Sequence, residues 1–283
     1  MKQQFSSLHT HTIFCDGNDD VETMCRAAFE KGLTAIGFSS HAPIGKTGLK
    51  STWHIKDDRL NEYIDEVNAA RRRWEGKIAV YLGMEVDYIK GLRSAMDSDI
   101  KGLGLDYIIG SVHYLVPLRG GPFTVDAAEG LEKGIAESYG GDGEAMMNAY
   151  WNTVAEMIAL GGFDIIGHMD LVKKNNRTGN LFNLGSAYLQ RAEEIVSAAS
   201  ASDLIAEVNT GGLNRGWTAE TCPSPAILRL LRQYNVPVII TADAHKAADM
   251  GGNYQTACQV LLDAGYTDHV LFEGKKDGKP VWV

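Results

Sequence analysis

The feature of this sequence that most restricts its fold is a regular alternation of short β-type runs with amphipathic helical segments. Seven runs rich in β-branched or aromatic residues are bounded by glycine or polar residues, at positions 5–9, 35–39, 79–86, 107–112, 164–168, 204–209 and 236–242. Helical patterns fall between most of these runs, and strands that alternate with helices form a parallel sheet. The sequence therefore predicts an α/β fold built on seven strands.

Three helices can be placed from apolar residues that recur every three or four positions and so share one helix face. The first covers about residues 21–28 and is expected to stop at Gly32, and the second covers residues 60–74. The third covers residues 189–199, with Ser186 as its expected N-cap.

The length of 283 residues is compatible with one domain or two, since α/β barrels commonly take about 200–250 residues as a single domain. The prolines are scattered, and no proline-rich linker, low-complexity tract or repeat divides the chain. We therefore expect one barrel domain over residues 1–283. The longest interruption is the glycine-rich stretch 117–143, for which a functional lid and a partly helical surface insertion are equally good interpretations.

Charge and cysteine content exclude several classes of function. The chain has 27 Lys and Arg against 36 Asp and Glu, a net charge of −9, which argues against binding to nucleic acid or to an anionic membrane. Its four cysteines lie far apart without a CxxC pair, which argues against a zinc-thiolate site and a disulfide scaffold. A polar N-terminus and the lack of any run of 18 apolar residues predict neither a signal peptide nor a transmembrane helix. We expect a cytoplasmic protein.

Histidines and carboxylates gather at the carboxyl ends of the predicted strands. Six of the eight histidines lie there. Since the carboxyl ends of parallel barrel strands converge on one mouth, where such folds build their active sites, these residues are expected to meet in one cleft. The predicted metal ligands are His9, His11, Asp16, His41, Glu85, His113, His168, Asp243 and His245.

The chemistry of these side chains favours divalent metal ions. His9 and His11 are two residues apart, so on an extended chain both imidazoles point to the same side and can bind one ion, and Asp243 and His245 repeat this spacing. Imidazole nitrogen with carboxylate oxygen and no thiolate suits zinc, manganese or iron. A catalytic zinc ion takes about three protein ligands, so this set predicts two or three ions. His54 and His269 lack the strand-end context and are expected not to be ligands.

These residues resemble the signatures of the PHP (polymerase and histidinol phosphatase) family over nearly the whole chain. The family pattern is a histidine pair after the first strand, single histidines after later strands, and a closing Asp-x-His. Segments 111–114, 166–174, 207–215 and 222–225 are similar to those of bacterial-type histidinol-phosphate phosphatases in the family. Two departures concern the substrate: the 117–143 loop is longer and richer in glycine than expected, and Asn214 precedes Arg215 where a basic pair is often seen.

The resemblance implies a distorted (β/α)7 barrel of the PHP type that holds three metal ions. One ion would be bound by His9, His11, Glu85 and Asp243, a second by Glu85, His113 and His168, and a third by Asp16, His41 and His245. The implied activity is a metal-dependent phosphomonoesterase of histidine biosynthesis, most simply a histidinol-phosphate phosphatase that releases histidinol and phosphate.

The hydrolysis itself is expected to proceed by attack of a metal-bound hydroxide on phosphorus, without a covalent enzyme intermediate. Glu85, Asp243 and Arg215 are the predicted catalytic residues. Arg215, Lys173 and Asn209 are the predicted substrate-binding residues, with the Arg215 guanidinium forked onto two phosphate oxygens. Asp243, Asp170 and a metal-bound water are the candidates for protonating the leaving alkoxide.

Three alternatives stay open at this point. A PHP-type enzyme of this kind could act instead on another small phosphate ester, on phosphotyrosine or on nucleic acid, although nucleic acid would require a basic track. An amidohydrolase-type hydrolase also begins with His-x-His, but it generally adds a strand-end lysine or histidines in a different order. A non-catalytic metal scaffold would usually close one ion with four ligands, whereas this set is spread over an open mouth.

Overall fold

The computed structural model describes residues 4–283. Seven parallel strands form one sheet in the order β1-β2-β3-β4-β7-β8-β9. They are β1 (Ser6–Ser7), β2 (Ala35–Phe38), β3 (Ala79–Asp87), β4 (Tyr107–Ser111), β7 (Ile165–Ile166), β8 (Ile205–Asn209) and β9 (Val238–Thr241). Each overlaps one of the seven runs predicted from the sequence, so the predicted strands are confirmed.

The sheet curls into a nearly closed barrel. Its two edge strands meet just beyond their carboxyl ends, where Thr10 and Ala244 form a parallel bridge. The His11 amide donates to the Ala244 carbonyl at 2.9 Å, and the Ala244 amide donates to the His9 carbonyl at 3.2 Å. The (β/α)7 barrel expected from the sequence is therefore confirmed, and its closure places both ends of the candidate ligand set side by side.

Residues along each strand alternate between the barrel interior and the surrounding helices. Ile205 packs inside the barrel with Tyr107, whereas Ala206 and Val208 of the same strand belong to the core beneath the helices. Because side chains of a strand alternate between its two faces, Glu207 must point to the same interior side as Ile205. Apolar residues fill the barrel interior toward the amino-terminal ends of the strands. The polar residues that follow them along a strand therefore line the interior at the carboxyl ends.

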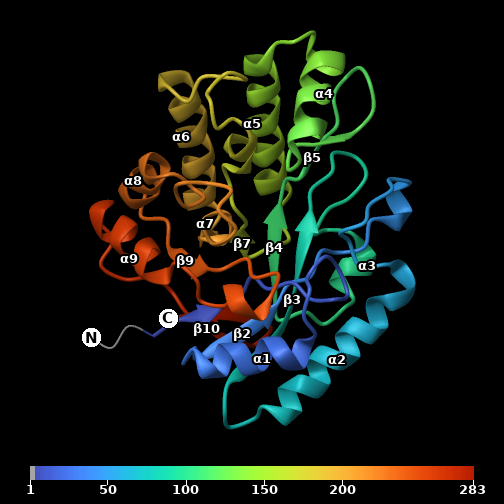
Figure 1. Cartoon of the computed structure of the whole chain (residues 1–283), viewed down its shortest axis with the longest axis vertical. Helices are drawn as coiled ribbons and strands as arrows, with labels where there is room; N and C mark the ends of the chain where they lie inside the picture. The colour runs from blue at the N-terminus through green and yellow to red at the C-terminus, as the bar shows by residue number, and fades with distance from the viewer. Residues whose placement is uncertain (1–3) are drawn as a thin grey trace.

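Nine helices accompany the strands over residues 4–283. They are α1 (Val21–Glu30), α2 (Leu60–Arg73), α3 (Ser98–Lys101), α4 (Ala128–Tyr139), α5 (Gly143–Leu160), α6 (Ser186–Ala201), α7 (Gly211–Asn214), α8 (Pro225–Gln233) and α9 (Tyr254–Asp263). The three predicted helices correspond to α1, α2 and α6. In Figure 1, α4, α5 and α6 lie together at one end of the molecule, and α1 and α2 lie at the other.

The predicted N-cap of the third helix is wrong. Ser186 is the first residue of α6, and Gly185 occupies the N-cap position without a capping side chain. The Gly185 amide instead donates to Asn183 Oδ1 at 2.7 Å. The helix therefore begins one residue earlier than it would with Ser186 as the N-cap. The first helix has a side-chain cap, because Asp20 accepts from the Thr23 amide at 2.7 Å.

The 117–143 stretch is partly helical. It contains β6 (Phe123–Thr124), which pairs with β5 (Tyr114–Leu115) as an antiparallel hairpin, and then α4. Gly134 of α4 sits so close to the Phe123 ring that a larger side chain would not fit between them. The stretch is therefore a packed substructure, and its role as a lid stays a prediction.

A C-terminal hairpin that the sequence did not predict covers the amino-terminal end of the barrel. Its strands β10 (Phe272–Lys276) and β11 (Lys279–Trp282) are antiparallel. Phe272 packs against Tyr107 inside the barrel and against Trp282. The mouth at the carboxyl ends of the strands thus remains the accessible end. None of the helices in residues 4–283 combines the length and the apolar character needed to cross a bilayer.

Candidate metal centre

Glu85 lies at the centre of the histidine cluster, near the end of β3. Its side chain is almost wholly buried. Oε2 lies 3.1 Å from His9 Nε2 and 3.0 Å from His41 Nδ1. Oε1 lies 2.9 Å from His168 Nε2 and 3.6 Å from His113 Nε2. One carboxylate therefore faces imidazoles that follow β1, β2, β4 and β7, which is the arrangement expected of a ligand shared between two ions.

Asp243 and His11 form the next part of the cluster. His11 Nε2 lies 3.2 Å from Asp243 Oδ1 and 3.6 Å from Glu85 Oε2. Asp243 follows β9 and has a left-handed backbone with φ of 47°, a conformation that aspartate tolerates better than most residues. Such backbone conformations concentrate at functional sites, where the surrounding structure holds them in place.

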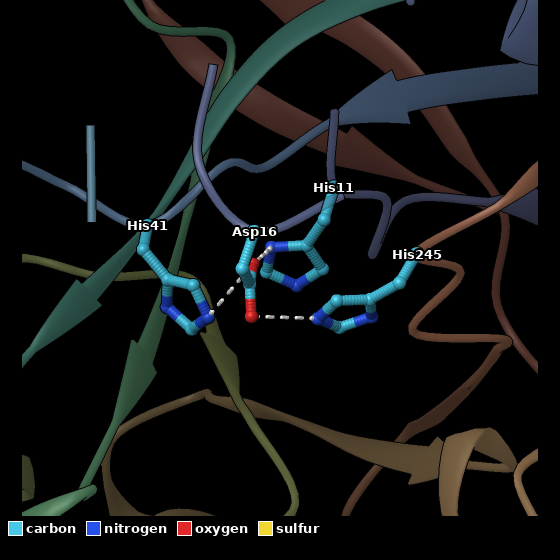
Figure 2. Close-up of side chains that lie close together, drawn as sticks. All are labelled: His11, Asp16, His41 and His245. Atoms are coloured by element: carbon cyan, nitrogen blue, oxygen red, sulfur yellow. Dashed lines mark hydrogen bonds and ion pairs between the residues drawn. The ribbon is translucent and has the colours of Figure 1, made fainter. Parts of the chain in front are cut away.

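Asp16 brings together a third group of side chains (Figure 2). Its carboxylate lies between three imidazoles that come from distant parts of the chain, with Oδ2 3.2 Å from His245 Nε2 and Oδ1 3.6 Å from His11 Nδ1. His41 Nε2 lies 3.8 Å from the same Oδ1. This group is the most open part of the cluster, since the Asp16 side chain is 32% exposed.

Unpaired atoms in the cluster test whether metal ions fit it. Six buried atoms of the cluster make no hydrogen bond to any residue between positions 4 and 283. One, His168 Nδ1, is the ring nitrogen that does not face Glu85. The other five are His9 Nε2, His11 Nε2, His41 Nδ1, Glu85 Oε2 and Asp243 Oδ1. Buried polar atoms are normally paired, and these five converge on one another. Lone pairs that face each other in this way suit a cation between them. The donor set, of imidazole nitrogens and carboxylate oxygens without thiolate, fits divalent ions.

Two buried carboxylates behind the cluster orient its histidines. Glu207 accepts from His9 Nδ1 and from Thr241 Oγ1, each at 2.5 Å, and from the His168 amide at 2.6 Å. Because Nδ1 is the donor, the lone pair of neutral His9 lies on Nε2 and points at Glu85 and Asp243. Carboxylates that bind the far nitrogen of a histidine in this manner commonly support metal ligands.

Asp87 orients His113 as Glu207 orients His9, by binding its Nδ1. Its Oδ1 accepts from His113 Nδ1 at 2.8 Å, and its Oδ2 accepts from His54 Nε2 at 2.6 Å. His54 is therefore tied to the site through Asp87, and it could also hold an ion together with His41 and Asp87. His269 lies apart and stacks on Phe5. That neither histidine is a ligand stays a prediction.

The ionisation of these groups reflects the crowding of acids and imidazoles. Burial opposes protonation of His9, yet Glu207, Glu85 and Asp243 together raise its pKa well above the usual value. Burial likewise opposes ionisation of Glu85, but His9, His41 and His113 hold its pKa well below normal. For His41, burial dominates and lowers the pKa to about 3. The electrostatic environment of His9 and Glu85 thus favours positive charge where the ligand atoms converge.

A cavity of about 300 Å³ opens above the cluster. Arg215 lies on its wall, where Nη1 donates to His245 Nδ1 at 2.6 Å and Nη2 donates to Asp243 Oδ2 at 3.1 Å. Its guanidinium also stacks on the Trp217 ring, 4.3 Å from the ring centroid. Its Nε proton has no partner among the described residues. The predicted phosphate ligand is thus fixed beside the predicted metal ligands.

The other two predicted substrate-binding residues are more strongly committed to the protein. Lys173 Nζ donates to Glu220 Oε1 at 2.8 Å and to the Thr221 carbonyl at 2.9 Å, and it forms an ion pair with Asp170 Oδ2 at 2.9 Å. Asn209 lines the cavity, but its amide is bonded to Glu207, Asp243 and the Gly211 amide. Contact with substrate stays a prediction for both.

Several residues of the site were not singled out from the sequence. The two supporting carboxylates, Glu207 and Asp87, each lie two residues from a selected residue on the same strand face, and an acid within a buried strand is a usable signal. Lys174, Asp126 and Trp217 line the cavity, and no local pattern marks them. By contrast, all nine predicted ligands lie in the cluster, although their binding of metal stays a prediction.

Comparison with known proteins places this site in context. The model of the PHP domain matches residues 7–211. The histidinol-phosphatase of Bacillus subtilis is 27% identical over 266 residues, which cover 87% of this chain and 96% of the relative. A Deinococcus radiodurans protein assigned as a histidinol-phosphatase is 29% identical over 258 residues, which cover 91% of this chain and 92% of the relative.

A solved structure supports the fold more directly. The crystal structure of hisK from Listeria monocytogenes, assigned as a histidinol phosphatase, matches with a TM-score of 0.79 at 25% identity. The match covers 89% of this chain and 99% of that one. Both chains therefore build the same barrel over nearly their whole length.

Proposed function

The chain belongs to the PHP domain family, and on this premise we propose that it is a metal-dependent phosphomonoesterase whose substrate is histidinol phosphate. The observation that carries the proposal is the convergence of five unpaired buried ligand atoms beneath a cavity whose wall holds Arg215. The histidinol-phosphatase names of the Bacillus and Deinococcus relatives support the choice of substrate. The barrel also matches that of Lactococcus lactis histidinol phosphate phosphatase, solved with zinc, L-histidinol and phosphate, at a TM-score of 0.71 and 18% identity.

Three groups of residues would hold the ions: His9, His11 and Asp243 with Glu85; His113 and His168 with the same Glu85; and Asp16, His41 and His245. Zinc, manganese or iron bound there would activate water for attack on phosphorus and neutralise charge on the phosphoryl oxygens. Within the protein, Glu207 and Asp87 hold the proton on the far nitrogen of His9 and His113, so that the near nitrogen of each ring presents a lone pair.

Arg215 would bind the phosphoryl group from the cavity wall. Its position is set by Asp243, His245 and Trp217, so the guanidinium needs little reorganisation when an anion arrives. Of the carboxylates considered as proton donors to the leaving group, Asp243 lines the cavity. Asp170 is fully buried and bound by Cys222, the Ser224 amide and Lys173, which removes it from contact with a leaving group.

A small ester suits the site better than a polymer. The cavity volume of about 300 Å³ is at the lower end of the range for small-molecule pockets. The net charge of −9 disfavours a polyanion, so a nucleic-acid substrate is the weaker candidate. A cytoplasmic location and a single domain over residues 1–283 remain part of the proposal.

The test is a comparison of kcat/KM for histidinol phosphate, p-nitrophenyl phosphate and other small phosphomonoesters, with the metal content of the same preparation measured. We expect histidinol phosphate to be the best substrate and activity to depend on bound metal. If the protein hydrolyses p-nitrophenyl phosphate but not histidinol phosphate, the proposed phosphatase activity stands and the proposed substrate is wrong. No phosphate release by the fully metal-loaded protein would refute the activity.

A further inference from the structure

Asp126 is a carboxylate of the cavity that the proposed metal chemistry does not use. Four carboxylates in the described part of the chain line the cavity: Asp16, Glu85, Asp126 and Asp243. The other three belong to the predicted ligand set, whereas Asp126 is in none of the side-chain groups that could hold an ion. It lies between β6 and α4, within the 117–143 stretch that interrupts the barrel. Its function must therefore be sought outside the metal centre.

The backbone around Asp126 is fixed to the site from two sides. The Val125 amide donates to the carbonyl of His113 at 2.9 Å, and the Val125 carbonyl accepts from Asn175 Nδ2 at 2.9 Å. The Asp126 amide donates to Thr124 Oγ1 at 3.1 Å. The backbone that carries the carboxylate is thus fixed relative to His113, a predicted metal ligand. A residue that binds part of the substrate must be held rigidly in this way.

The Asp126 carboxylate is only half engaged. Oδ1 accepts from Lys174 Nζ at 2.5 Å, while Oδ2 accepts no hydrogen bond from any residue in the described range 4–283. The side chain is 36% exposed, and the Lys174 ammonium group that it binds also lies over the Trp217 ring, 4.6 Å from the ring centroid. Burial opposes ionisation of Asp126, but Lys174 and His113 lower its pKa, so it is an anion at neutral pH.

The surroundings of this anion match a cation attached to an organic group. Trp53, Leu171 and Trp217 line the same cavity and supply apolar walls. A phosphate ester has its negative end at the metals and Arg215, so its leaving group extends along the remaining cavity wall. An aminated leaving group would place positive charge there, where the free carboxylate oxygen of Asp126 would stabilise it.

We propose that Asp126 binds the cationic nitrogen of the leaving group and makes the enzyme selective for phosphate esters of amino alcohols. This inference rests on the proposed function, since histidinol carries an ammonium group on the carbon next to the one that bears the ester oxygen. Asp126 is thus a specificity-determining residue supplied by the insertion, whereas the barrel strands supply the metal site. The competing explanation is that Asp126 only anchors Lys174.

The test compares Asp126→Asn with wild type on histidinol phosphate and on p-nitrophenyl phosphate, whose leaving group is not cationic. The measured quantity is the ratio of the two kcat/KM values. A hydrogen bond to a charged group contributes about 1.5–3 kcal/mol, so we expect this ratio to fall about tenfold or more. The inhibition constant of L-histidinol as product should rise by a similar factor. Glu132→Gln removes an exposed carboxylate of the same insertion and should leave the ratio at the wild-type value.

Lys174→Met separates the two explanations. It removes the ammonium and leaves the carboxylate, so the ratio should stay high if Asp126 contacts the substrate. A tenfold fall in the ratio for Lys174→Met, or an unchanged ratio for Asp126→Asn in a folded and metal-loaded protein, overturns the inference. If wild type itself shows no preference for histidinol phosphate, the proposed substrate fails instead, and the two failures are distinguished within one set of measurements.

Discussion

Glu207 determines how His9 presents its lone pair, and its replacement should be measurable as a loss of metal. In Glu207→Gln the neutral amide keeps the size of the side chain but no longer provides a charged acceptor for His9 Nδ1 and the His168 amide. Loss of a carboxylate that supports a metal-binding histidine typically costs about 10–100-fold in metal affinity. The measurement is metal content per chain after dialysis against a graded series of chelator concentrations.

A suitable control for Glu207→Gln is Glu137→Gln, which makes the same chemical change at an exposed position of α4. The control should retain metal as wild type does. Wild-type metal retention by a folded Glu207→Gln protein would contradict the positioning role of this carboxylate.

Arg215 is expected to act mainly on substrate binding. Its removal leaves the phosphoryl group with the metal ions alone, so KM for a phosphomonoester should rise more than about tenfold in Arg215→Ala. The KM of Arg215→Lys should lie between those of wild type and Arg215→Ala, because an ammonium group keeps the charge but cannot form paired hydrogen bonds to two oxygens. Since Arg215 also contacts Asp243 and His245, metal content must be measured on the same samples. An unchanged KM with full metal occupancy would refute the role.

At the residue scale, sequence alone was sufficient to predict which side chains lie together when their direction follows from the geometry of a single strand. The His-x-His and Asp-x-His spacings predicted shared faces, because side chains alternate along an extended chain. Lys173 shows where this reasoning ends. Its sequence position near Asp170 suggested a free cation, but Glu220 and the Thr221 carbonyl, which come from a distant loop, complete its hydrogen bonds. Such partners are set by tertiary structure and leave no local pattern.

At the scale of the strands, the barrel interior is tightly fitted around glycines. Gly83 of β3 pairs directly with Tyr107 of β4, and an alanine side chain at Gly83 would collide with the Tyr107 ring. We expect Gly83→Ala to lower the free energy of unfolding by about 1–3 kcal/mol, the usual cost of overpacking. The check is thermal or denaturant unfolding of the metal-loaded protein.

Gly121→Ala is the matched control for this substitution, because its added methyl group meets no atom nearby and its backbone does not need a positive φ. We expect its stability to differ little from wild type. Equal stability of Gly83→Ala and Gly121→Ala would show that β3 and β4 can separate enough to admit a methyl group.

The elements themselves differ in how well they can be predicted. The seven barrel strands were predictable because burial on both faces requires continuous apolar runs, which are visible in sequence. The hairpin of β10 and β11 was not, since much of it is exposed and lysine-rich, and only Phe272 and Trp282 reveal that it covers the barrel. The N-cap of α6 was misplaced for a similar reason, because the Asn183 side chain decides where the preceding turn forms.

On the scale of the whole molecule, the acidic balance and the active-site chemistry are compatible because charge is distributed unevenly. The net charge is −9, yet two or three divalent ions would add +4 to +6 at the mouth against the three predicted ligand carboxylates, Asp16, Glu85 and Asp243. The site can therefore attract a small phosphate while the remaining surface repels long polyanions. The same concentration of acids and imidazoles should make the barrel depend on its metals for stability.

Removal of the metals should destabilise the fold measurably. Without ions, the five ligand atoms that converge at the barrel mouth are buried and unpaired. A ligand present at 100 times its Kd stabilises the folded state by about 2.7 kcal/mol, and a change of 1 kcal/mol shifts Tm by about 2–4 °C for a chain of this size. We therefore expect Tm to fall by roughly 5–10 °C on chelation and to recover when zinc or manganese is added back. Glu85→Gln, which weakens the shared ligand, should respond much less to chelator. An unchanged Tm after verified loss of all metal would mean that the barrel closes without the ions, through bonds such as those between Ala244, His9 and His11.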